Sequence, residues 1–337
     1  MADIWYIFNR HPNSEAVYPD EDARLAALAR LLARKPRVYE EREHRHGDGC
    51  TPLMRAAESS LPRVVAALLA AGADPNVALS DGRTALHWAA QFGDMYWHPA
   101  DDLATVRVLL ATGADPNATE GHDTALHCAV FHYTKAPVAF EIISTLLEAG
   151  ADPNRRGRQG RTPLHYATTA AATKLLLDAG ADIAARDDTG CTPLVAACAD
   201  RHDEVVAVLL ARGSDVRSTD EKGRAALHNV ALTRTAGPRQ IRRLVEAGAD
   251  PNQPDADGRT PLHIAAGVHI GEMATILVKL GARLDAVDHA GMTPLALVEA
   301  GLYLGPLRTA EAWHEVGPLP SGRTRLMRHL RKLGATH

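Results

Sequence analysis

A nine-residue stretch, Gly258-Arg259-Thr260-Pro261-Leu262-His263-Ile264-Ala265-Ala266, constrains this chain most because it returns seven more times in altered form. Its threonine position recurs at residues 51, 84, 124, 162, 192, 225, 260 and 293, with alanine replacing threonine at 225. The intervals are 33, 40, 38, 30, 33, 35 and 33 residues. Self-similarity at a period of about 20–50 residues predicts an architecture of stacked repeats, each a single supersecondary unit.

Each residue type in the motif has a local structural reason. Gly258 permits a turn with positive φ that other residues resist. Thr260 can cap a helix with its hydroxyl, and Pro261 suits the first helical turn, where no amide donor is needed. Leu262 and Ala265 lie on one apolar helical face, where alanine lets a neighbouring helix approach closely. The sequence therefore predicts a short helix after each threonine position.

A second helix and an extended segment complete each repeat. Residues 273–280 predict the second helix, and the pentapeptide Gly-Ala-Asp-Pro-Asn follows such a helix at residues 72–76, 113–117, 150–154 and 248–252. Its glycine ends the helix in a left-handed turn, and its proline keeps the preceding aspartate extended. We call the loop from this pentapeptide to the next threonine position the finger. Because no unit buries its apolar face alone, stacked units are predicted to share one continuous core.

The motif T-P-L-H-x-A-A, at a period near 33, resembles the ankyrin repeat from about residue 47 to residue 301. The resemblance implies an all-α ankyrin-repeat solenoid of helix-turn-helix units with extended fingers. We expect an N-terminal capping segment at 1–46, ankyrin repeats 1–8 at 47–301, and an expanded last repeat with a C-terminal capping helix at 302–337. Gly317-Pro318-Leu319-Pro320 is similar to the end of a SOCS box, but the expected upstream Leu-Cys-Arg element is missing.

The N-terminal segment lacks the repeat motif. Acidic residues 20–22 precede leucines 25, 28, 31 and 32 at helical spacing, which predicts a helix from 21 to 34 that stops before Pro36. We expect this helix to cap the solenoid, with the run Trp5–Phe8 folded onto it. The alternative is a peptide that binds a partner. At the other end, residues 325–335 show the polar, basic outer face typical of a C-terminal cap.

Composition narrows the function classes. Hydrophobic residues make up 46% of the 337 residues and aromatic residues only 4%, so the core must be aliphatic. A net charge of −4 predicts neither nucleic-acid binding nor attraction to an anionic membrane. Four cysteines without a C-x-x-C pair, and no signal peptide or apolar span, favour a cytoplasmic monomer with free thiols. The excess of arginine over lysine, with abundant alanine, indicates a bacterial genome.

Two adjacent repeats are longer than the others between their two helices. Repeat 2 gains about eight residues around 95–101, and repeat 3 about five around 131–137. Because insertions map to one side of a solenoid and aromatic residues dominate binding hot spots, we expect one partner-binding patch there. The alternative is a local mini-core. Six of the fifteen Phe, Trp and Tyr residues lie in or beside the insertions: Phe92, Tyr96, Trp97, Phe131, Tyr133 and Phe140.

Arginine precedes the threonine position in four repeats, at Arg83, Arg161, Arg224 and Arg259. The resemblance implies that this position lies on the concave face and contacts partners, so the four arginines would form a basic line along the groove. Repeat 4 is short before its second helix, which predicts that its first helix or the following turn is tighter. Its finger, residues 155–161, carries four arginines, either as a solvated loop or as a contact for an acidic partner.

No motif predicts catalysis or a metal site. Histidines 87, 127, 165, 228 and 263 are the motif histidine, which the resemblance implies is bonded to the backbone of a neighbouring unit. His44 and His46 lack further ligands at zinc-site spacing, and the common nucleotide, nucleophile and metalloprotease motifs are missing. We therefore predict a non-catalytic protein-binding module without cofactors. The alternatives are an inhibitor or immunity protein that blocks a cognate toxin or enzyme, and an enzyme or regulator with activity in the divergent termini.

Overall fold

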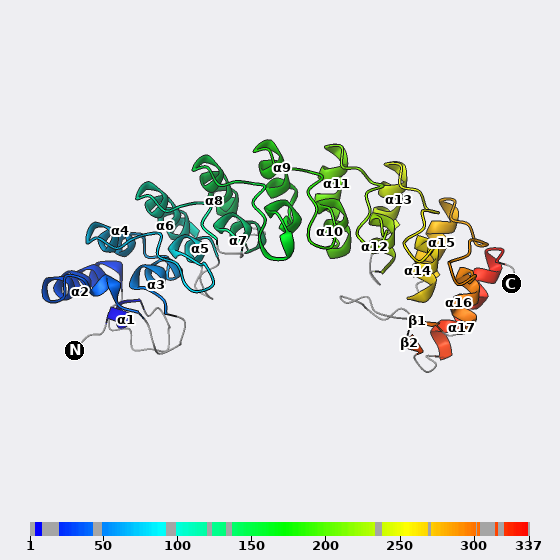
Figure 1. Ribbon diagram of the computed structural model, residues 1–337, viewed down its shortest axis with the longest axis horizontal. Coiled ribbons are helices and arrows are strands. Elements are labelled where there is room, and N and C mark those ends of the chain that lie inside the picture. The colour runs from blue at the N-terminus through cyan, green and yellow to red at the C-terminus, as the bar shows by residue number, and fades with distance from the viewer. Residues whose placement is uncertain are drawn as a thin grey trace. The chain divides into compact units, whose positions relative to one another are not determined.

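The structure is a computed structural model that describes residues 4–8, 20–42, 49–91, 99–119, 123–132, 137–232, 238–268, 271–300, 302–303, 314–315 and 320–335. The regular elements of these residues are helices, apart from two strands of two residues each (Figure 1), which confirms the all-α solenoid class. The chain divides into two compact units, Met1–Asp182 (unit 1) and Ile183–His337 (unit 2).

Unit 1 arranges its helices in two rows, in which each helix contacts the next (Figure 1). The first helices of its repeats are α3 (Pro52–Glu58), α5 (Ala85–Ala90), α7 (Ala125–His132) and the 3-10 helix η3 (Pro163–Tyr166). The second row is α2 (Glu21–Arg34), α4 (Pro62–Ala70), α6 (Pro99–Ala111), α8 (Pro137–Glu148) and α9 (Ala170–Asp178). The remaining short elements are α1 (Ile4–Ile7), η1 (Val38–Glu40) and η2 (Arg158–Gly160).

Unit 2 repeats the same arrangement of paired helices. Its first helices are α10 (Pro193–Asp200), α12 (Ala226–Leu232), α14 (Pro261–Gly267) and α16 (Pro294–Ala300). Its second helices are α11 (Asp203–Ala211), α13 (Pro238–Glu246), α15 (Gly271–Lys279) and α17 (Pro320–Lys332). The strands β1 (Leu302–Tyr303) and β2 (His314–Glu315) pair antiparallel, with Leu302 opposite Glu315. This strand pairing was not predicted from the sequence.

The N-terminal helix has the predicted limits. Asp20 caps α2 by accepting a hydrogen bond from the backbone N–H of Ala23 at 2.7 Å, and α2 ends at Arg34, just before Pro36. The side chain of Arg24, itself buried, donates to the carbonyl of Ile7, so α1 is folded onto α2 as expected. The capping role of this segment stays a prediction.

The motif leucine is at most 2% exposed in all eight repeats, so the continuous aliphatic core follows the predicted register.

The motif histidine accepts a hydrogen bond from the backbone at the start of the first helix. In α14, the backbone N–H of Thr260 donates to Nδ1 of His263 at 3.1 Å. Because Nδ1 accepts a hydrogen bond there, the ring proton lies on Nε2, which donates to the carbonyl of Met292 in the next repeat at 3.0 Å.

The same link from histidine to the next repeat occurs three more times. His87 donates to the carbonyl of Asp123, His127 to that of Arg161, and His228 to that of Arg259, each at 3.0 Å. These bonds confirm the expected structural role of the motif histidine at His87, His127, His228 and His263. Where the motif has Val195 in place of histidine, the hydroxyl of Thr192 caps α10 directly.

Repeat 4 has fewer residues than the other repeats because its first helix is shorter. The element η3 is a 3-10 helix of four residues, which is tighter than an α-helix. The second helix, α9, then begins at Ala170, where the hydroxyl of Thr169 accepts a hydrogen bond from the backbone N–H of Ala172 at 3.2 Å. The predicted shortening is therefore confirmed.

The asparagine of each Gly-Ala-Asp-Pro-Asn pentapeptide bridges to the next repeat. The side-chain amide of Asn117 donates to the carbonyl of Gly150 at 2.8 Å, and its oxygen accepts from the N–H of Asp152 at 2.7 Å. Equivalent pairs of bonds join Asn76 and Asn154 in unit 1, and Asn252 in unit 2, to the following repeat. These bridges give a structural reason for the asparagine in each pentapeptide, which was not predicted from the sequence.

Candidate functional site

A groove of about 470 Å³ lies over the first helices of repeats 2 to 4 in unit 1. Its lining residues occupy fixed positions relative to the motif histidine, which lies in the groove wall as His87 and His127. Apart from Asp81 and Arg158, the other lining residues stand four residues before that histidine, one after it or four after it. These positions supply Arg83 and Asp123, then Cys128 and Tyr166, then Gln91 and Phe131.

Phe131 is the most accessible aromatic side chain of the groove, at 53% exposed. Its ring meets the ring of Tyr166 edge to face, with centroids 5.9 Å apart. Tyr166 also packs edge to face against His127, at 5.8 Å. The short helix η3 thus holds Tyr166 so that it supports Phe131, and about half of the Phe131 side chain is exposed.

Arg83 enters the same groove from the finger of repeat 2. Its guanidinium forms an ion pair with Asp81 at 2.7 Å and lies over the ring of Trp88, 4.5 Å from the centroid. Trp88 was not predicted from the sequence as a site residue. The signal was the residue directly after the motif histidine, which is aromatic in repeats 2 and 4 (Trp88 and Tyr166).

The groove brings together two predicted sets of residues that were derived separately. Phe131 comes from the aromatic set beside the insertions and Arg83 from the arginine set, and both line it. Arg161 lies nearby, with its guanidinium 5.7 Å from the centroid of the Tyr166 ring. Four predicted aromatic residues lie outside the described residues, so the aromatic patch stays a prediction: Phe92, Tyr96, Trp97 and Tyr133.

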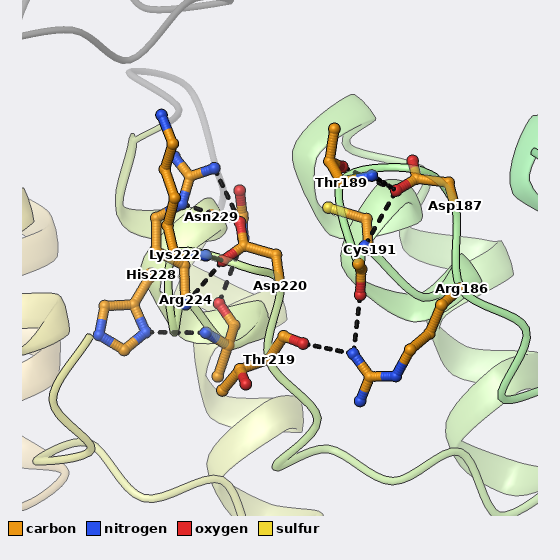
Figure 2. Close-up of polar contacts among 12 residues, drawn as sticks. Arg186, Asp187, Thr189, Cys191, Thr219, Asp220, Lys222, Arg224, His228 and Asn229 are labelled. Atoms are coloured by element: carbon orange, nitrogen blue, oxygen red, sulfur yellow. Dashed lines mark hydrogen bonds and ion pairs between the residues drawn. The ribbon is translucent and has the colours of Figure 1, made fainter. Parts of the chain in front are cut away.

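The other two predicted arginines belong to unit 2, where carboxylates of their own fingers hold them. Figure 2 shows Arg224 against Asp220, whose Oδ2 lies 2.9 Å from Nε and 2.7 Å from Nη2 of the guanidinium. The other oxygen, Oδ1, accepts from the backbone N–H groups of Lys222 and Arg224. Arg259 pairs with Asp257 at 2.9 Å. These ion pairs compensate both arginine charges within the fingers.

In the preceding finger of Figure 2, an aspartate side chain again accepts hydrogen bonds from the backbone of its own turn. Oδ1 of Asp187 accepts from the backbone N–H groups of Thr189, at 2.9 Å, and Cys191, at 3.0 Å. Arg186 donates to the carbonyls of Gly190, at 2.8 Å, and Thr219, at 2.6 Å, and so ties this finger to the next one. The fingers of unit 2 are thus built around internal carboxylates.

Burial holds two histidines and one cysteine of the unit 1 groove neutral. Burial lowers the pKa of His87 to about 4 and also lowers the pKa of His127. Burial raises the pKa of the Cys128 thiol to about 12, so it is protonated at neutral pH and is a poor nucleophile. Within the described ranges, no group of three His, Cys, Asp or Glu side chains could hold a metal ion. The groove therefore offers shape, aromatic surface and charge.

None of the helices in the described part of the chain is long and apolar enough to cross a membrane. Stacked helix pairs linked by histidine and asparagine bridges define a helical-repeat protein. The family model for ankyrin repeats (3 copies) matches residues 21–120, 53–157, 95–187, 133–220, 169–236 and 227–299. The chain belongs to the ankyrin-repeat family.

Several proteins are similar to this chain over part of their length. Ankyrin repeat and SOCS box protein 16 of Mus musculus is 38% identical over 202 residues, which are 56% of this chain and 43% of that protein. Nuclear factor NF-kappa-B p105 subunit of Gallus gallus is 34% identical over 172 residues, 48% and 16% of the two chains. Mitochondrial disaggregase of Bos taurus is 31% identical over 180 residues, 52% and 24%. The chain thus spans less than half of each relative, and what they share is a module that binds proteins.

Proposed function

We propose that this chain binds a protein partner, without catalysis, through the groove over repeats 2 to 4. The observation that carries the proposal is Phe131, which is 53% exposed in the groove and braced by Tyr166. Aromatic side chains set in a defined pocket are the usual anchors of protein interfaces. The insertions follow α5 and α7 directly, so Tyr96, Trp97 and Tyr133 are proposed to extend the same binding surface, together with Phe92.

The hydrogen bonds of the groove support a non-catalytic role. His87 accepts from the backbone N–H of Thr84 through Nδ1 and donates to the carbonyl of Asp123 through Nε2. His127 uses both ring nitrogens in the same way, with Thr124 and Arg161. A general acid or base must exchange a proton with its substrate, and these rings already commit both nitrogens to the backbone.

The test begins by identifying the partner, through cross-linking of the full chain in its native host and mass spectrometry. Calorimetry then compares the wild type with Phe131→Ala. We expect the affinity to fall at least about tenfold, because an exposed aromatic anchor contributes about 2 kcal/mol when truncated. The control is Val287→Ala, since Val287 is 58% exposed, lies in unit 2 and does not line the groove. Its affinity should stay within about twofold of the wild type.

Equal affinities of Phe131→Ala and the wild type would contradict the proposed groove. The same partner also decides between a binding module and an inhibitor, because an inhibitor must suppress the activity of the protein it binds. We expect the partner's activity, measured with and without saturating chain, to separate the two. An activity of the isolated chain toward the partner would overturn the non-catalytic proposal.

A further inference from the structure

A second groove, of about 540 Å³, lies between α15 and α17 in unit 2. Four basic residues of α17 line it: Arg325, Arg328, His329 and Lys332. Their spacing of three, four and seven residues places them on one face of the helix, over a rise of about 10 Å. Across from them, α15 contributes Glu272 and Thr275.

The arginine and lysine charges of this groove outnumber its single carboxylate, that of Glu272. Arg331, on the neighbouring face of α17, is paired with Glu299 at 2.6 Å. Within the described residues, Arg325, Arg328 and Lys332 make no ion pair, and all three are exposed. No acidic residue follows Glu315 in the chain, so α17 carries its five arginine and lysine charges without a carboxylate of its own.

The walls of the groove are fixed. The ring of His329 is hydrogen-bonded to the hydroxyl of Thr275, and that hydroxyl donates to the carbonyl of Gly271 at 2.7 Å. Gly271 has no side chain, and a Cβ built there would lie 3.6 Å from Leu326 and 3.7 Å from His329. The floor is thus apolar and open, between a basic wall and a wall that carries one carboxylate.

We propose that this groove binds an acidic segment of a partner protein in an extended conformation. Alternate side chains of an extended peptide lie about 7 Å apart on one face, so two or three carboxylates match the cations along α17. The carboxylate of Glu272 accepts hydrogen bonds from peptide N–H groups but repels phosphodiesters. The apolar floor at Leu326 and Gly271 suits a peptide backbone or a small side chain. The net charge of −4 also disfavours long polyanions such as nucleic acids.

The test uses a fluorescent peptide of about 12 residues with alternating Glu and Ala, and the matching Gln–Ala peptide. Fluorescence anisotropy with the full chain at about 50 mM salt limits screening. We expect Arg325→Gln with Arg328→Gln to weaken binding of the acidic peptide at least about fivefold. The control is Arg239→Gln with Arg242→Gln, which removes the same charge from an exposed face of α13. That pair should change affinity less than about twofold.

A steric variant separates the groove from simple charge attraction. Gly271→Leu leaves every charge in place but fills the floor, so it should weaken binding of the acidic peptide as strongly as the arginine pair does. Three results would overturn the proposal: equal losses in the α13 control, unchanged binding by Gly271→Leu, or no binding of the acidic peptide above the Gln–Ala peptide. Preferential binding of single-stranded DNA of equal charge, or of vesicles containing phosphatidylserine, would also overturn it, in favour of another anion.

Discussion

Units 1 and 2 are built from the same repeat, but their fingers are joined to one another differently. In unit 2 the backbone of each finger bonds to the next. The N–H of Glu221 donates to the carbonyl of Thr189 at 3.0 Å, and the same bond joins Ala256 to Lys222 and His289 to Asp257. Each of these fingers begins its turn with an aspartate that accepts backbone N–H groups: Asp187, Asp220, Asp255 and Asp288.

The fingers of unit 1 lack this aspartate. Leu79 and Gly157 stand at the start of the turns in repeats 2 and 4, and the described residues of unit 1 contain no backbone bond from finger to finger. A side chain takes over, since Asp123 accepts from the backbone N–H of Arg158 at 3.0 Å. The aromatic groove of unit 1 lies beside these fingers. An aspartate at the start of the turn therefore accompanies fingers that are joined through their backbones. In unit 1, where other residues replace it, the contact between fingers is made by a side chain.

The largest expected effect tests whether the two units share one kind of core. Leu126 in unit 1 and Leu262 in unit 2 occupy the same motif position, and both are fully buried. We expect Leu126→Ala and Leu262→Ala each to lower the free energy of unfolding by about 2–5 kcal/mol, because each leaves a cavity. Chemical denaturation measures both. A loss under about 0.5 kcal/mol for either variant would contradict the common repeat register.

The second effect is acid destabilisation through the motif histidine. The pKa of His87 is lowered by burial from 6.5 to about 4, so the unfolded chain binds this proton more readily than the folded chain. Stability should therefore fall as the pH drops from about 6.5 to about 4, by up to about 3 kcal/mol from this residue. Valine replaces the histidine naturally at Val195, so His87→Val should flatten the dependence of unfolding free energy on pH over that window. An unchanged slope would contradict the assignment.

Much of the fold could be predicted because it depends on local chemistry. The positive φ of Gly258, +78°, the burial of Leu262 and the limits of α2 each follow from a residue type and its near neighbours. The groove was predicted only in part. Phe131 and Arg83 were named for separate reasons, and their meeting depends on how successive helices stack. The bonds between fingers join backbone groups more than thirty residues apart, and a single sequence does not show which of them meet.

The third effect compares glycines of the two units that share a positive φ. Gly223 in unit 2, at +72°, faces the next finger so closely that a Cβ would lie 2.7 Å from the backbone nitrogen of Ala256. Gly113 in unit 1, at +90°, has nothing within 4 Å of that position. We expect Gly223→Ala to cost about 2–3 kcal/mol, from left-handed strain plus the clash, and Gly113→Ala about 1 kcal/mol from strain alone. Thermal unfolding of both variants measures the difference, and equal costs would show that the fingers of unit 2 can separate without penalty.

The smallest effect concerns the asparagine bridges. In unit 1 they join repeats whose described fingers lack the backbone bonds that join the fingers of unit 2, which we call the backbone ladder. Asn117 makes two hydrogen bonds to the next repeat, at 2.8 and 2.7 Å. One repeat of unit 2 has Arg217 at the equivalent position, and this side chain reaches the carbonyl of Gly248 with one bond of 3.4 Å. A partly exposed hydrogen bond contributes about 0.5–1 kcal/mol, so Asn117→Ala should cost about 1–2 kcal/mol and Arg217→Ala less than about 0.5 kcal/mol.

Hydrogen exchange shows which residues lose stability when denaturation measures a lower free energy of unfolding. In Asn117→Ala, the amide of Asp152 loses its acceptor and should exchange faster than in the wild type, because Asn117 Oδ1 is the group it donates to. The amides of Ala256 and His289, which belong to the backbone ladder of unit 2, should keep their protection. If the ladder amides lost protection to the same degree, the bridges and the ladder would act as one cooperative system. The two units would then differ in local chemistry but not in how their fingers are stabilised.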